Sequence, residues 1–91
     1  MSTMTAPKTA GTVTAPLTAA RAEALYMSTL PTGVAPSRSE VTSAIRTALR
    51  SHGGVRGCAA DVAGEYGEYP DTAARRMTWA LGVVDAVYGV H

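Results

Sequence analysis

The sequence predicts an all-α fold, a compact four-helix domain with a disordered N-terminal tail. Apolar residues recur every three or four positions in several segments, which is the spacing of one face of an α-helix. Glycine and proline separate these segments, and no stretch shows the alternation of a strand. The 91 residues are enough for one domain and contain no evident repeat. We therefore expect a helical domain over residues 17–91 and a tail over residues 1–16.

The tail is predicted from its composition. Its sequence, MSTMTAPKTAGTVTAP, is mostly Thr, Ala and Pro with one charged residue, so ordering it would cost entropy with little apolar burial in return. It also lacks the apolar segment of a signal peptide. The chain has one cysteine and no run of roughly eighteen apolar residues. We expect a cytoplasmic protein without a membrane helix.

The first two predicted helices differ in how clearly the sequence marks their ends. Leu17–Leu30 is rich in alanine, and Thr18 is its candidate cap. It ends before Pro31, which disfavours helical geometry at the preceding residue. Ser37–His52 opens with S-x-x-E, a capping box, and stops at a Gly-Gly pair. Its apolar side keeps helical spacing throughout: Val41, Ala44, Ile45, Ala48, Leu49 and His52.

The last two predicted helices, Val55–Tyr66 and Asp71–Gly89, are joined by the turn GEYP, with Asp71 as the expected N-cap. The final helix is apolar nearly all round, which is typical of a helix that is central or packed against a partner. One of its stripes is expected inside the domain, namely Met77, Leu81, Val84 and Tyr88. We expect this helix to be central in part, and its other stripe to form an interface with a second copy of the chain: Trp79, Val83, Ala86 and Val90.

The net charge of the chain does not indicate strong nucleic-acid binding, but the placement of its arginines could support it. The formal net charge is +1, far from the strongly basic balance typical of nucleic-acid-binding domains. Arginines nevertheless lie along the second helix and open the last one, where they could contact phosphates. The alternative is ordinary solvation, or pairing with the acidic residues of segment 61–71. The candidate nucleic-acid contacts are Thr72, Arg75, Arg76, Arg46 and Arg50.

Cys58 and His52 are the candidate reactive residues. A thiolate needs a positive or helix-N-terminal setting, and Cys58 lies near the start of the third helix with His52 as its candidate base. Cys58 also occupies an apolar position flanked by alanine, as a buried small hydrophobe would. His52 is equally explained as a last-turn cation that complements the helix dipole. Cys and His are too few for a structural zinc, and we expect no metal and no cofactor.

Part of the chain resembles the helix-turn-helix modules of Fis-like DNA-binding proteins. The segment HGGVRGCAA is similar to the start of that motif, and DTAARRM to the opening of its recognition helix. About three more residues separate the two elements here than in the motif. The resemblance implies that Thr72, Arg75 and Arg76 face the major groove of DNA, because recognition helices lead with their N-terminal residues.

A longer stretch, from about Ala22 to Tyr88, resembles a group of small helical proteins of filamentous high-GC (actinobacterial) bacteria. The elements that carry this resemblance are ALYMSTL, RGCAADVAGEYGEYP and RMTWA. Members of the group have no established biochemistry, and some are encoded near natural-product biosynthesis genes. The resemblance implies an accessory or regulatory role and transfers no catalytic residue.

Together these observations favour a small, non-catalytic interaction or accessory protein. We expect it to be homodimeric, to contact a further protein, and to act in natural-product metabolism. One alternative is a helix-turn-helix transcriptional regulator. A second is a small biosynthetic enzyme or ligand carrier, with an apolar pocket lined by Trp79, Met77 or Cys58.

Overall fold

The computed structural model describes residues 16–89 and confirms the all-α, four-helix fold in that range. No strand occurs among these residues. The tail predicted over residues 1–16 lies, but for its last residue, outside the described range, as does Val90 of the predicted interface. The helices are α2 (Pro16–Tyr26), α3 (Arg38–Ser51), α4 (Gly54–Glu68) and α5 (Pro70–Tyr88).

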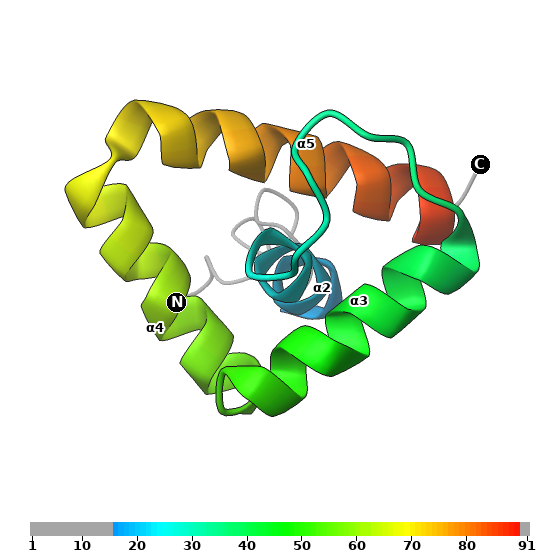
Figure 1. Ribbon diagram of the computed structural model, residues 1–91, viewed down its shortest axis with the longest axis horizontal. Coiled ribbons are helices and arrows are strands. Elements are labelled where there is room, and N and C mark those ends of the chain that lie inside the picture. The colour runs from blue at the N-terminus through cyan, green and yellow to red at the C-terminus, as the bar shows by residue number, and fades with distance from the viewer. Residues whose placement is uncertain (1–15, 90–91) are drawn as a thin grey trace, which may run out of the picture.

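The central helix is α2, the shortest of the four. Figure 1 shows α3, α4 and α5 as the sides of a triangle, with α2 seen almost end-on inside it. Helix α2 packs against all three of the others. The last helix, which was expected to be central in part, forms one side of the triangle instead. The alanines of α2 leave little side-chain bulk, so three helices approach it from different sides.

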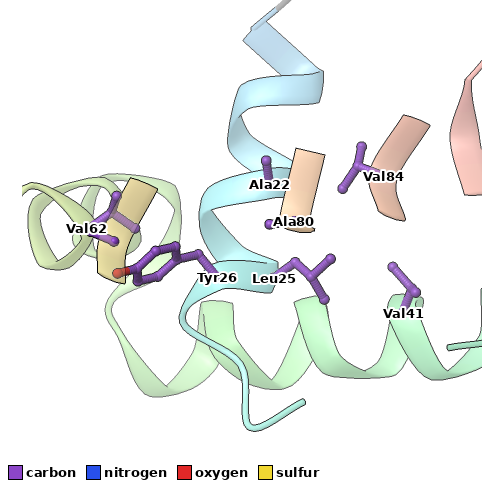
Figure 2. Close-up of a cluster of buried hydrophobic side chains, with 8 residues drawn as sticks. Ala22, Leu25, Tyr26, Val41, Val62, Ala80 and Val84 are labelled. Carbon is purple, nitrogen blue, oxygen red and sulfur yellow. The ribbon is translucent and has the colours of Figure 1, made fainter. Parts of the chain in front are cut away.

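The core is arranged around two neighbouring side chains of α2. Leu25 and Tyr26 leave the helix in different directions, and Figure 2 shows Tyr26 directed toward Val62 of α4 while Leu25 lies on the side of Val41. Because these two residues are adjacent in sequence, both sides of α2 are buried at this level. The cluster of buried residues is Ala22, Leu25, Tyr26, Val41, Val62, Ala73, Ala80 and Val84.

Some apolar positions that fit the helical spacing are exposed instead. Leu17 is 59% exposed and Val55 is 51% exposed, and both lie in the first turn of their helix. Leu81 also remains exposed, although it falls on the stripe expected inside the domain. Periodicity identifies an apolar face, but a neighbouring helix has to cover that face for its residues to be buried.

The boundaries of α3 follow the sequence signals. The backbone N–H of Glu40 donates to Ser37 Oγ over 3.2 Å, and the backbone N–H of Ser37 donates to Glu40 Oε1 over 2.8 Å. This is the capping box predicted from the sequence. At the other end, Gly53 and Gly54 adopt φ values of 82° and 78°, a left-handed conformation that glycine adopts without strain. The chain thereby turns directly from α3 into α4.

Helix α2 ends at Tyr26, four residues before the predicted end at Leu30. In a continued helix, the Leu30 N–H would donate to the Tyr26 carbonyl. Here the Leu30 N–H donates to Ser28 Oγ over 3.3 Å, and the Tyr26 carbonyl accepts from Arg76 Nε over 2.7 Å. The helix therefore stops where an arginine from α5 donates to its last carbonyl group.

The turn between α4 and α5 is tighter than predicted. Helix α4 continues to Glu68, so only Tyr69 lies between the two helices. Pro70 occupies the first helical position of α5, where its missing N–H costs nothing and its fixed φ suits the helix. The N-cap is Tyr69, and Asp71 lies in the first turn instead of capping the helix.

Candidate functional site

The Trp79 stripe of α5 is partly covered by the loop that joins α2 to α3. Trp79 Nε1 donates a 2.8 Å hydrogen bond to the carbonyl oxygen of Val34, which fixes this loop against α5. A groove of about 390 Å³ remains between the two segments. We call it the Trp79 groove. It is lined by Val34, Ala35, Pro36, Thr78, Trp79, Gly82, Val83, Ala86 and Val87.

The structure brings three of the four predicted interface residues, Trp79, Val83 and Ala86, to this one groove. Trp79 and Val83 are half-buried and Ala86 is exposed. The contribution of the loop was not predicted. The apolar run Val34-Ala35-Pro36 is the feature of the sequence that could have indicated it.

The floor of the groove is open at Gly82. A Cβ atom added at this glycine would meet no atom within 4 Å outside its own helix backbone. Gly82 also belongs to a row of small, exposed residues spaced four apart along α5, namely Ala74, Thr78, Gly82 and Ala86. Small residues at this spacing let the backbone of a second helix approach closely.

Arg76 has a structural role that the sequence did not reveal. Besides its bond to Tyr26, its Nη2 donates to the carbonyl oxygens of Ser28 (3.0 Å) and Leu30 (2.9 Å), and its Nη1 donates to Thr32 Oγ1 (2.8 Å). Its guanidinium also lies 4.8 Å from the centroid of the Trp79 ring. One side chain thus holds the end of α2, the following loop and α5 together.

The candidate nucleic-acid contacts do not form one surface. The donors of Arg76 are engaged within the fold, while Thr72 and Arg75 are exposed at the start of α5. Arg46 and Arg50 are exposed on α3. The start of α5 adjoins the end of α4 at one corner of the triangle, and α3 forms a different side of it (Figure 1). The two groups of candidate contacts therefore lie on different sides of the domain.

The α4–α5 pair also differs from a helix-turn-helix in its connection. That motif joins its helices by a turn of about three or four residues. Here the segment that seemed to intervene between the two elements, AGEYGEYP, is helical except for Tyr69. The extra residues lengthen the two helices instead of forming a turn.

Cys58 and His52 make separate contacts in the structure. Cys58 is fully buried beside Ala24 and Ala48, and its Sγ lies 3.8 Å from the Ala48 carbonyl oxygen. Burial raises the pKa of the thiol, and the Asp61 and Glu23 carboxylates raise it further. The His52 Nδ1 instead lies 2.7 Å from Asp61 Oδ2, in a pair that spans the α3–α4 corner. The alternative interpretation of Cys58, a small buried hydrophobe, accounts for this position.

We expect the Cys58 thiol to resist modification in the folded protein. A buried thiol with a raised pKa supplies little thiolate, and the thiolate is the reactive form. Alkylation by iodoacetamide at pH 8 should be slower than for the unfolded chain by about 100-fold. Mass spectrometry of quenched time points, with and without denaturant, measures both rates. Equal rates would contradict the burial of Cys58.

The same raised pKa gives a pH dependence of stability. Between the pKa of the unfolded thiol and that of the folded thiol, the unfolded chain has lost the proton and the folded chain has kept it. Cys58 therefore lowers the free energy of unfolding as the pH rises above the unfolded pKa of about 8.5. Its contribution vanishes in a Cys58→Ala variant.

Comparisons with protein-family models, curated proteins and solved structures found no significant match to this chain. Both resemblances drawn from the sequence accordingly remain predictions. Within residues 16–89, no helix combines the length and the apolar character needed to cross a membrane. No three His, Cys, Asp or Glu side chains of the described part of the chain converge as a metal site.

Proposed function

We propose that this protein is a small, non-catalytic interaction protein that forms a homodimer through the Trp79 groove and the neighbouring small residues of α5. The observation that carries the proposal is the open floor at Gly82, flanked by the apolar side chains of Trp79 and Val83. A helix of a second copy that lies along this row would bury both side chains further.

A two-fold axis near Gly82 suits this surface. In such an arrangement both copies contribute the same surface, so that surface has to complement itself. With two antiparallel α5 helices crossing at Gly82, Thr78 of each copy faces Ala86 of the other. All three residues are small and exposed, and no charged side chain lines the groove.

The alternatives receive less support from the geometry. An enzyme or carrier would need an enclosed apolar pocket lined by Trp79, Met77 or Cys58. Trp79 lines the open groove, whereas Cys58 is buried in a separate cluster with Ala24 and Ala48. For a DNA-binding regulator, Arg76 would have to be free to contact phosphate. The resemblance to small proteins of high-GC bacteria adds an accessory role near natural-product biosynthesis to the proposal.

The test is the oligomeric state of wild type and of Gly82→Glu, measured by light scattering after size exclusion. We expect the wild type to be a dimer. A glutamate at Gly82 would place a charge in a closely packed apolar interface, and we expect it to weaken the dimer by at least about 30-fold. The monomer should stay folded, because the site is open and glutamate is a better helix former than glycine.

The matched control is Gly64→Glu in α4. Gly64 is also helical, exposed and open to an added side chain, but it does not line the groove. We expect this variant to remain a dimer. Trp79→Glu would be a poorer test, since it also removes the hydrogen bond that fixes the loop at Val34. A monomeric wild type, or equal dimerisation of Gly82→Glu, would refute the proposal.

A further inference from the structure

Three arginines from two helices gather at the side of the domain where α2 and α3 meet the end of α5. Arg21, Arg38 and Arg46 line a hollow of about 340 Å³, and Tyr88 and Thr42 also line it. A second hollow, of about 520 Å³, shares Arg38, Thr42 and Arg46 with the first and adds the hydroxyl groups of Ser39 and Ser43. We call the two together the arginine hollow.

Two of these arginines are held in place by the end of α5. The guanidinium of Arg21 lies 4.0 Å and that of Arg38 lies 4.7 Å from the centroid of the Tyr88 ring. Arg38 Nη1 also donates to the Val87 carbonyl oxygen over 2.9 Å. The Tyr88 hydroxyl is itself fixed, at 2.6 Å from Thr42 Oγ1. Cationic groups that are already held by such contacts lose little further freedom when they bind an anion.

The charge of the arginine hollow is unbalanced. None of the residues that line it is Asp or Glu, although the chain as a whole has a net charge of only +1. Three carboxylates, those of Asp61, Glu65 and Glu68, belong to α4, which does not line the hollow. Glu23, Glu40 and Asp85 belong to the helices that form the hollow but do not line it. Three like charges held together favour an anion that neutralises them.

The chemistry of the lining selects the anion. Guanidinium groups match the oxygen geometry of phosphate, and serine and threonine hydroxyls add further donors. The first hollow is also lined by Ile45 and Leu49, both half-buried and apolar. A ligand that fits both parts has a phosphate at one end and an uncharged, partly apolar group at the other.

We propose that the arginine hollow binds a small organic phosphate, with the phosphate among Arg21, Arg38 and Arg46 and the organic part against Ile45 and Leu49. The proposal goes beyond dimer formation and does not depend on it. A small molecule fits better than the backbone of a nucleic acid. The exposed Arg75 lies at the start of α5, away from the hollow at the end of that helix, and the exposed Arg50, four residues after Arg46 on α3, does not line the hollow.

The test is isothermal titration of the protein with butyl phosphate and with inorganic phosphate. We expect saturable binding of butyl phosphate at millimolar concentration or below, and binding of inorganic phosphate that is several-fold weaker because it leaves Ile45 and Leu49 uncovered. Chemical shifts of the backbone amides should move at Thr42 and Arg46. The variant Arg46→Gln should weaken butyl phosphate binding by about tenfold or more.

The matched control is Arg75→Gln, which changes the net charge equally at an exposed position outside the hollow. It should bind butyl phosphate as the wild type does, and thermal unfolding should show that both variants are folded. Several results would overturn the proposal: no saturable binding, an equal loss in both variants, or equal affinity for both phosphates. If short duplex DNA binds more tightly than butyl phosphate, and Arg46→Gln abolishes that binding, the hollow is a nucleic-acid site and the proposal is wrong.

Discussion

The Gly57→Ala variant should be destabilised by about 3 kcal/mol or more, which is a large part of the stability of a domain this small. A Cβ atom at Gly57 would overlap the carbonyl oxygen and the carbonyl carbon of His52. These atoms belong to the backbone at the end of α3, so no side-chain rotation relieves the overlap. The α3–α4 corner has to open, and the contact of Cys58 with Ala48 opens with it.

Gly64→Ala is the control for Gly57→Ala. Both glycines lie in α4, but an added Cβ at Gly64 meets nothing within 4 Å. Alanine is the better helix former, so this variant should gain up to about 1 kcal/mol. Urea unfolding followed by circular dichroism measures both free energies. If both substitutions stabilise the protein alike, the close approach of α4 to His52 is not real.

The Arg76→Ala variant should be destabilised by at least about 3 kcal/mol. It loses four hydrogen bonds, three of them to carbonyl oxygens at or just after the end of α2, and leaves these acceptors without their donor. It also loses the contact of the guanidinium with the Trp79 ring. The largest structural change should be in the 27–36 loop, which hydrogen exchange of the loop amides would report.

Arg75→Ala is the matched control for Arg76→Ala, because it removes the same charge from the adjacent, exposed residue. Its free energy of unfolding should change by less than about 0.5 kcal/mol. Arg76→Lys should recover only a minor part of the loss, since one ammonium group cannot reach acceptors that a planar guanidinium bridges. A stable Arg76→Ala variant with an unchanged loop would show that the carbonyl groups find other partners.

These two arginines also bear on the DNA-binding alternative. A combined Arg75→Ala and Arg76→Ala variant would lose DNA binding through unfolding alone, whatever the protein binds. The informative substitution is Arg75→Ala, which leaves the fold intact and removes an exposed candidate phosphate contact.

Local signals were enough to predict the existence of the four helices and the most sharply marked ends. The capping box of Ser37 and Glu40 and the left-handed glycines that follow α3 are satisfied within a few residues of the chain. Such interactions depend on nearby backbone groups, so the sequence specifies them almost independently of the fold. Helical spacing also marked the buried Val41, Cys58 and Val84.

The position of each helix in the domain depended on contacts that periodicity does not encode. Helix α5 is the longest of the four helices and is apolar nearly all round, and it was expected to be central in part. The short α2 occupies that position because small residues such as Ala22 and Ala24 admit three neighbours. An apolar helix face indicates that another segment covers it, but it does not identify that segment.

The candidate sites, like the fold, were predicted only in part from the sequence. The sequence determined that this chain forms helices, where α3 begins and ends, and that Trp79, Val83 and Ala86 share one stripe. Only the tertiary structure decided that the 34–36 loop covers part of that stripe, that Arg76 holds the end of α2, and that Arg21 and Arg38 both lie over the Tyr88 ring. The physical reason is distance along the chain. Helix caps join residues about three apart, whereas these contacts join residues that only the packing of the helices brings together.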